Sequence, residues 1–240
     1  MMNQSDVPGN ALQQTSTSGF SFRGLVEIFY QPASFFEKLK NNPKVLVPYL
    51  VFGILILTFF WFAQDLVFEM QMQSEQFQEQ MQGQVMTPVV EKITKISIVV
   101  FGSISLCLSP LLATLFALFW GNFVYAGKAS FKALLSVMVY SEIIYAVGIV
   151  ILIPLMLAKE SILVSLSLGV LAANAGPESL LYLALSKIDV FNIWEIIVVG
   201  IGLSTIYGLP RNKGYWLSVL SMGMISILHI VFTAIGKLLL

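Results

Sequence analysis

The sequence predicts an all-α polytopic membrane protein: a bundle of five transmembrane helices preceded by N-terminal interfacial amphipathic helices. Three observations support this fold class. Hydrophobic residues make up 57% of the 240 residues and charged residues only 11%, against about 25% charged residues in an ordinary soluble domain. The mean hydropathy is +0.85. Five apolar runs approach or exceed the length of about 20 residues that a spanning helix needs.

The N-terminal residues 1–20 differ in composition from the rest of the chain. They are rich in Ser, Thr, Gln, Asn and Gly, and such a segment buries too little apolar surface to offset its ordering entropy. The sequence therefore predicts a disordered tail at 1–20 and one membrane domain at 21–240. The tail lacks the basic and apolar regions of a signal peptide, so the first span is expected to act as the insertion signal.

Residues 22–43 precede the first apolar run and mix bulky apolar groups with basic ones at helical spacing. This pattern is typical of an interfacial amphipathic segment. Pro32 is expected to divide it into two short helices, with Ser34 as the N-cap of the second. A helix packed on a soluble partner is the alternative.

The five apolar runs are predicted to be five spanning helices. They cover residues 45–63, 95–121, 132–157, 192–209 and 215–238. The Met- and Gln-rich connection at 64–90 is expected to extend the first two helices beyond the membrane. A sixth apolar stretch at 162–173 is too short to span and predicts an interfacial or re-entrant segment on the external side. If it did cross, the C-terminus would lie inside.

The distribution of Lys and Arg predicts the orientation. Eight basic residues lie on the side of the N-terminus and five on the opposite side. Because cytoplasmic loops carry the excess of basic residues, the N-terminus is expected in the cytoplasm and the C-terminus outside. The predicted location is a cell membrane of the bacterial inner-membrane type.

Small residues at every fourth position are predicted to form helix-packing faces. Helices in lipid associate through close van der Waals contact, which small side chains permit. The second span has one such row and the fourth a shorter one: Ser105, Ser109, Ala113, Ala117 and Gly121, then Gly200, Ser204 and Gly208.

The sequence lacks the motifs of the main hydrolase and nucleotide-binding classes. His229 is the single histidine, with no HExxH or GxSxG motif, and neither a P-loop nor a GxGxxG turn occurs. We therefore expect a protein that is not an enzyme, with no cofactor and no metal. A formal net charge of zero argues against nucleic acid as a partner.

Glu142 and His229 are the candidate intramembrane polar site. Acids within spans are rare and are functional candidates by default. Two residues alone do not make a pathway, however, and a neutral or hydrogen-bonded Glu142 and a packing His229 are the alternatives. Asp189 and Glu195 flank the outer end of the fourth span, where solvent is expected to be close, so they are weaker candidates.

Three segments suggest a family. They are PASFFEKLKNNP at 32–43, the Gln-rich connection at 64–90, and LSKIDVFNIWEIIVVGIGLS at 185–204, which leads into a basic turn. Together they resemble the prokaryotic branch of the Yip1 membrane-protein family, from about residue 22 onward. The resemblance implies five spans, a cytoplasmic N-terminus and no catalytic motif. Eukaryotic members resemble vesicle-traffic factors that associate with Rab GTPases, a partner not carried over here, and some prokaryotic members resemble accessory subunits of exporters.

The expected function is that of a scaffold, adaptor or assembly factor that contacts other membrane proteins in the lipid bilayer. An ABC-type exporter is one expected partner, and a second copy of the chain is another. The first alternative is a small-solute or ion permease with Glu142 in the pathway. The second is membrane remodelling by residues 22–43.

Overall fold

The computed structural model describes residues 22–73, 77, 86–164, 166–176 and 179–239. The predicted tail at 1–20 lies outside this described part. Every regular element within it is a helix. In chain order these are α1 (Phe22–Tyr30), α2 (Pro32–Asn41), α3 (Leu46–Met72), α5 (Pro88–Leu118), the π-helix η1 (Phe119–Val124), α6 (Phe131–Ala158), the 3-10 helix η2 (Leu168–Ala175), α7 (Leu180–Ser186), α8 (Val190–Tyr207) and α9 (Arg211–Leu239).

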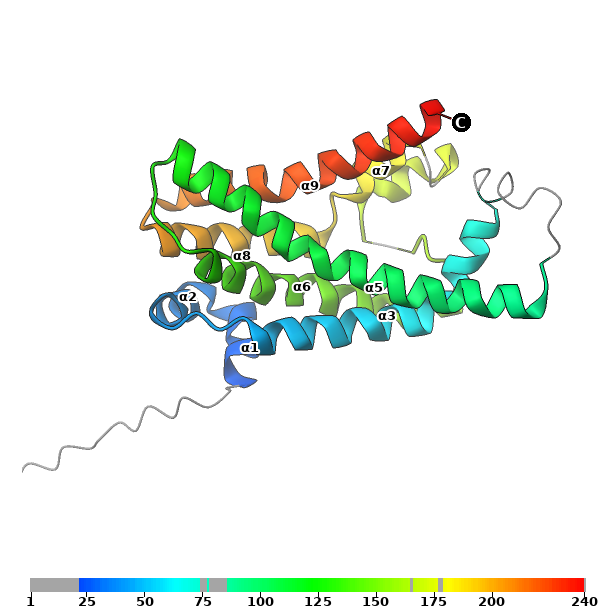
Figure 1. Cartoon of the computed structure of the whole chain (residues 1–240), viewed down its shortest axis with the longest axis horizontal. Helices are drawn as coiled ribbons and strands as arrows, with labels where there is room; N and C mark the ends of the chain where they lie inside the picture. Colours follow the sequence, from blue (N-terminus) through cyan, green and yellow to red (C-terminus); the bar gives the residue numbers. More distant parts are fainter. Residues whose placement is uncertain (1–21, 74–76, 78–85, 165, 177–178, 240) are drawn as a thin grey trace, which may run out of the picture.

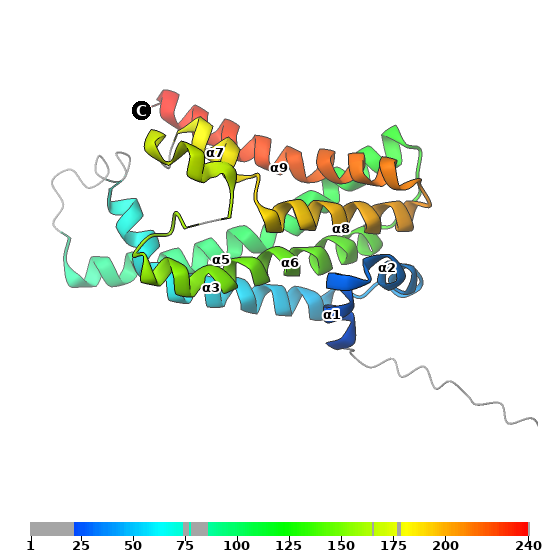
Figure 2. The ribbon, with the colours of Figure 1, turned by 180° about the vertical axis from the view of Figure 1, so that it is seen from behind.

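Five helices are long and apolar enough to cross a membrane, which confirms the predicted fold class. They are α3, α5 with η1, α6, α8 and α9, and they lie side by side (Figures 1 and 2). α3 has 27 residues and is therefore about 40 Å long, more than the hydrocarbon core requires. The helical extension predicted beyond the first span is present up to Met72.

The bundle has two ends that differ in construction. We call the end formed by α1, α2 and the connection from α8 to α9 the α2 end, and the opposite end, formed by η2 and α7, the α7 end (Figure 1). The segment at 162–173 does not form a spanning helix, since it is a loop followed by η2. α7 contacts both η2 and α9.

α6 is the central helix. It contacts α3, α5 and α8, and the residues from Ala133 to Ile144 are all buried. A helix that is apolar on all sides is expected in such a central position. Its sequence therefore explains its place in the bundle.

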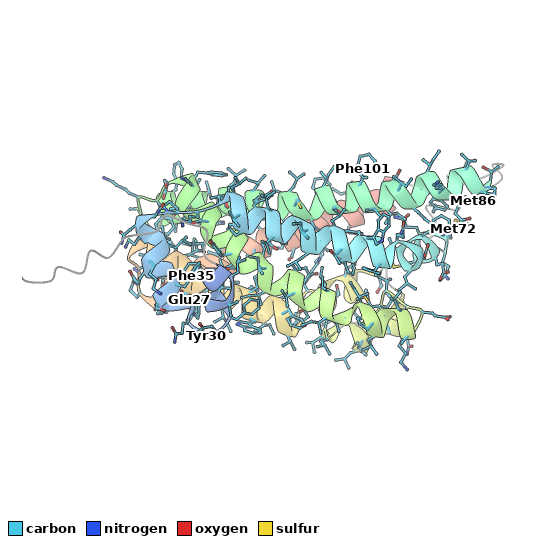
Figure 3. All side chains as sticks on the ribbon, turned by 90° about the horizontal axis from the view of Figure 1, so that it is seen from below. Glu27, Tyr30, Phe35, Met72, Met86 and Phe101 are labelled. Atoms are coloured by element: carbon cyan, nitrogen blue, oxygen red, sulfur yellow. The ribbon has the colours of Figure 1, made fainter. Side chains whose placement is uncertain are left out.

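α1 and α2 pack on the bundle with their apolar side chains. Phe35, Phe36 and Leu39 are buried, and the ring centroids of Phe35 and Tyr140 on α6 are 4.7 Å apart. Figure 3 shows Phe35 and the α1 residue Glu27 on this part of the molecule. Much of the apolar face predicted to contact the membrane surface thus contacts the chain's own helices.

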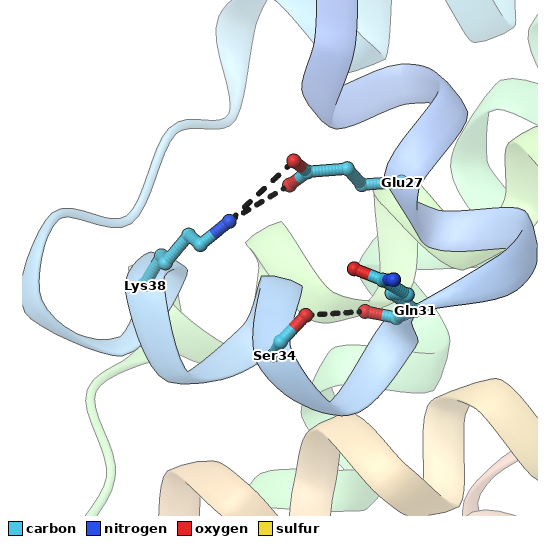
Figure 4. A network of polar contacts seen from close by, with 4 residues as sticks. All are labelled: Glu27, Gln31, Ser34 and Lys38. Carbon is cyan, nitrogen blue, oxygen red and sulfur yellow. Dashed lines mark hydrogen bonds and ion pairs between the residues drawn. The ribbon is translucent and has the colours of Figure 1, made fainter.

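The junction between α1 and α2 is held by polar contacts (Figure 4). Lys38 Nζ lies 3.2 Å from Oε2 of the buried Glu27. The predicted N-cap at Ser34 is wrong: α2 begins at Pro32 after the N-cap residue Gln31, because proline is favourable in the first helical turn. The Ser34 hydroxyl instead donates to the Gln31 carbonyl at 3.2 Å.

Candidate functional site

Glu142 lies in the middle of α6 and is 8% exposed. The hydroxyl of Ser109 on α5 donates a hydrogen bond of 2.7 Å to its Oε1. A hydrogen bond offsets part of the cost of placing a carboxyl group among apolar helices. The sequence left open whether Glu142 is hydrogen-bonded to a neighbouring helix. In the structure it is.

Glu195 on α8 is a second buried acid, and it is only 2% exposed. Its Oε1 has no hydrogen-bond partner in the described part of the chain. α8 packs against α6, which carries Glu142. The structure thus buries two acids on neighbouring helices, which the sequence did not predict.

The expectation that solvent lies close to Glu195 is wrong because of where α8 begins. Phe191, near the start of α8, packs directly on Gly148 of α6, and α6 continues for ten more residues to Ala158. α8 therefore starts about 15 Å short of the end of α6. The signal was present in the sequence: Asp189 is a good N-cap, and a helix from 190 to the Gly208-Leu-Pro turn is short for a span.

A cavity of about 230 Å³ occupies the space beside the last turns of α6. α6 lines it with Tyr145, Ile149, Leu152 and Met156. The remaining lining residues come from α3, the loop before η2, α7, the connection from α7 to α8 and the start of α8: Phe59, Ile162, Val164, Leu166, Ser167, Tyr182, Ser186, Lys187, Asp189, Phe191 and Asn192.

The two buried acids lie just beyond the deepest cavity residues. Glu142 precedes Tyr145 by three positions on α6, and Glu195 follows Asn192 by three positions on α8. Residues three apart share a helix face and are about one turn apart along the axis. The carboxyl pair therefore lies about one helical turn deeper in the bundle than the cavity.

The polar groups of the cavity lie at the α7 end. Asp189 caps α8, since its Oδ1 accepts from the backbone N–H groups of Phe191 and Asn192 at 2.8 and 3.0 Å. Burial lowers the pKa of Lys187, while the charge of Asp189 acts in the opposite direction. Burial also raises the pKa of Tyr182. This end therefore combines charged and apolar groups around one cavity.

The other half of the predicted polar site, His229, belongs to α9. Its side chain lies outside the described part of the structure. A role for His229 therefore stays a prediction.

The α2 end of the bundle is closed by Tyr207 of α8. Its ring fills the space beside Gly121 and Gly127, where a Cβ atom would overlap it. Its hydroxyl donates to the carbonyl of Ala117 at 3.1 Å. This packing explains why a glycine occupies position 121 at the end of the small-residue row.

The row on α5 is divided between the inside and the outside of the bundle. Ala113, Ala117 and Gly121 are buried and Ser109 reaches Glu142, whereas Ser105 is exposed. The row from Ser109 to Gly121 therefore packs against the chain's own helices. The outer position, Ser105, faces the surroundings of the bundle.

The row on α8 meets α9. A Cβ atom on Gly200 would lie 3.0 Å from Tyr215 Cα, and one on Gly214 would overlap the Gly200 carbonyl and Ser204. Ser218 Oγ on α9 donates to the Ile196 carbonyl at 2.7 Å. Small residues on both helices thus allow the two backbones to approach closely.

Gly208 has a different position from the rest of its row. It is the exposed C-cap of α8, with φ of +67°, and has open space where a Cβ atom would be. This left-handed conformation favours glycine at a helix end. The role of Gly208 is therefore to end α8. Two basic side chains bind carbonyl groups of this last part of α8: Lys40 Nζ donates to the Thr205 carbonyl at 3.0 Å, and Arg211 Nη1 donates to the Ile201 carbonyl at 2.7 Å.

The described residues limit the chemistry of this site. No group of three or more His, Cys, Asp and Glu residues among them could hold a metal ion. Buried carboxyl groups on adjacent helices can take part in a proton or cation relay. The cavity can accept a small ligand with both polar and apolar parts.

Comparison with known proteins gives a family but no individual relative. The family model described as the Yip1 domain matches residues 26–234. Neither the curated proteins nor the solved structures contain a match. The match starts within α1 and ends within α9, so it includes all five long helices. The chain therefore belongs to the Yip1 family of membrane proteins.

Proposed function

We propose that this chain is a non-enzymatic scaffold, adaptor or assembly factor that binds other membrane proteins laterally. The Yip1 family is not known as an enzyme family. An exporter complex of the ABC type is the partner that we propose to look for first. A second copy of the chain is the other candidate.

The observation that carries the proposal is the outward face of α5. Exposed residues recur along it at three- and four-residue spacing: Phe101, Ser105, Leu108, Leu112 and Leu115. We call this set the α5 stripe. Figure 3 shows Phe101 of this set on α5.

Ser105 is the polar and small member of the α5 stripe. Its hydroxyl has no hydrogen-bond partner among the described residues. A hydroxyl that faces lipid gains when a neighbouring helix supplies an acceptor, and a small side chain lets that helix approach. These properties favour the packing of a helix from another protein on this part of α5 over contact with lipid alone.

Affinity purification in mild detergent tests the proposal. Ser105→Phe places a bulky group at the small position of the α5 stripe, while Leu57→Phe adds a ring at an exposed position on α3. We expect a membrane protein to copurify in near-stoichiometric amount with the wild type and with Leu57→Phe, but not with Ser105→Phe. Equal recovery with both variants would show that the partner binds elsewhere.

A permease is the second candidate function, and the pair of Glu142 and Glu195 beneath the cavity favours it. Such a pair could relay a proton or a cation. Against it, Tyr207, Gly121 and Gly127 pack tightly at the α2 end. Glu142→Gln and Glu195→Gln should each abolish a coupled transport activity in proteoliposomes yet leave copurification of a partner unchanged.

Membrane remodelling by residues 22–43 has weaker support. The phenylalanines that would enter the bilayer, Phe35 and Phe36, are buried against the bundle. If the full chain leaves the shape of liposomes unchanged, this idea is excluded.

The membrane and the orientation belong to the same proposal. We place the chain in a cell membrane of the bacterial inner-membrane type, with the α2 end in the cytoplasm. Lys40 and Arg211 both lie at the α2 end, where they bind carbonyl groups of α8. Basic residues on that side agree with the rule that cytoplasmic loops are the more basic ones.

A further inference from the structure

Three residues that line the cavity at the α7 end have side-chain donors with no hydrogen-bond partner in the described part of the chain. They are Lys187 Nζ, Tyr145 Oη and Tyr182 Oη. They come from three places in the chain: α6, α7 and the connection between α7 and α8. The cavity therefore gathers unused donors, one of them cationic.

The other polar groups of the cavity are already used within the chain. Asp189 accepts three hydrogen bonds, two from backbone N–H groups and one of 2.7 Å from Asn192 Nδ2. Ser186 Oγ donates to the Leu183 carbonyl at 2.9 Å, and Ser167 Oγ accepts from Gly169 N at 3.1 Å. The polar groups of the lining that remain without a partner are thus mainly hydrogen-bond donors.

The charges favour an anion beside Lys187. The negative charge of Asp189 faces the N-terminus of α8, where the helix dipole and two backbone N–H groups balance it. Glu142 and Glu195 lie deeper and are not part of the lining. Asp189 acts electrostatically on Lys187, but the ammonium forms no ion pair among the described residues, so it can still bind an anion.

The walls of the cavity and its surroundings are apolar. Phe59, Leu152 and Met156 face the cavity. The segment that covers it also carries exposed apolar residues, among them Leu171 at 80% exposure, with Leu166 and Leu181 each more than half exposed. Such residues are expected where a segment borders lipid. A ligand could therefore reach the donors from the bilayer.

The size of the cavity limits what can enter. Its volume of about 230 Å³ is below the range of about 300–1,000 Å³ that is usual for sites holding a drug-sized ligand. A headgroup fits this space better than a complete lipid, whose chain would remain outside.

We propose that this cavity binds the anionic headgroup, a phosphate or a carboxylate, of a membrane amphiphile, with Lys187, Tyr145 and Tyr182 as the hydrogen-bond donors. An anion beside Lys187 would also offset the burial that lowers its pKa. The site lies apart from the α5 stripe, so it goes beyond the scaffold proposal.

Calorimetric titration of the purified full chain in uncharged detergent micelles tests this site. The probes are hexyl phosphate and hexanoate, with hexanol as the uncharged control of the same chain length. We expect saturable binding of at least one anion and at least tenfold weaker binding of hexanol. Tighter binding of hexyl phosphate would assign the site to phospholipids, and tighter binding of hexanoate would assign it to fatty acids.

Two variants and one control make the test specific. Lys187→Gln should weaken binding of the anion at least tenfold, and Tyr182→Phe should weaken it severalfold without changing the shape of the cavity. Lys159→Gln removes an exposed lysine at the α7 end of α6 and should bind as the wild type does. Binding unchanged in both Lys187→Gln and Tyr182→Phe, equal binding of hexanol, or no saturable binding of either anion would overturn the proposal.

Discussion

The hydroxyl of Ser109 on α5 donates a 2.7 Å hydrogen bond to the carboxyl group of Glu142 on α6. This bond gives one member of the small-residue row a role beyond close packing. It connects two spanning helices through a buried polar contact. Such contacts contribute to helix association in membranes.

Ser109→Ala should lower the free energy of unfolding by about 1–3 kcal/mol, because a buried carboxyl group loses its hydrogen bond. Denaturation in mixed detergent micelles measures this change. Ser103→Ala is the matched control on the same helix, since Ser103 Oγ is buried and has no partner in the described part of the chain. That control should be neutral or slightly stabilising. An equal loss in both variants would contradict a specific role of the bond.

Gly121→Ala should destabilise the bundle by about 1–3 kcal/mol, since overpacking a close contact forces side chains and backbone to shift. The added methyl group would overlap the Tyr207 ring and disturb its hydrogen bond to Ala117. Gly223→Ala is the control: it has open space around the new Cβ atom, and alanine favours a helix over glycine by about 0.5–1 kcal/mol. Melting temperatures in one detergent should therefore move in opposite directions. A Gly121→Ala variant that melts at the temperature of the wild type would show that the α2 end is loosely packed.

The stability of the chain should rise with pH through Lys187. Burial lowers the pKa of Lys187 below its ordinary value of 10.5, and Asp189, which lines the same cavity with Tyr145 and Tyr182, acts against this shift. Between the native pKa and 10.5 the unfolded chain holds more protons at this position than the native chain does. The native state therefore gains stability as the pH rises through this window.

The difference in stability between the wild type and Lys187→Gln isolates this effect. Melting curves across the alkaline range should show a gain for the wild type that the variant lacks. Lys159→Gln, which removes an exposed lysine, should keep the gain. A pH profile of Lys187→Gln that runs parallel to the wild type would show that Lys187 titrates at its ordinary pKa.

Labelling with a membrane-impermeant maleimide should place the two ends of the bundle on opposite sides of the membrane. Asn212→Cys is exposed at the α2 end and Lys159→Cys at the α7 end. In a Cys107→Ser background, the cysteine at 159 should react in intact cells and the cysteine at 212 only after lysis. The reverse pattern would invert the proposed orientation.

The fold follows from hydrophobic run length, and the sequence predicted it well. All five runs correspond to long helices, and the run at 162–173 does not form a spanning helix. A bilayer allows few alternatives to helices of that length. The central place of α6 agrees with its long and mostly apolar sequence.

The site was only partly predictable, because its members meet through tertiary packing. Glu142 stands out as an acid within a span, but the depth of Glu195 depends on where α8 starts along α6, which the contact of Phe191 with Gly148 sets. The burial of α1 and α2 likewise required the partner surface, since an amphipathic pattern does not distinguish lipid from protein.

Photo-crosslinking in native membranes tests the scaffold proposal most directly. A benzophenone amino acid at position 105, within the α5 stripe, is compared with the same residue at position 57 on the exposed face of α3. We predict a discrete protein adduct from position 105, identified by mass spectrometry, and lipid adducts alone from position 57. Lipid adducts alone from both positions, in membranes that hold the chain at its native level, would contradict lateral binding through α5.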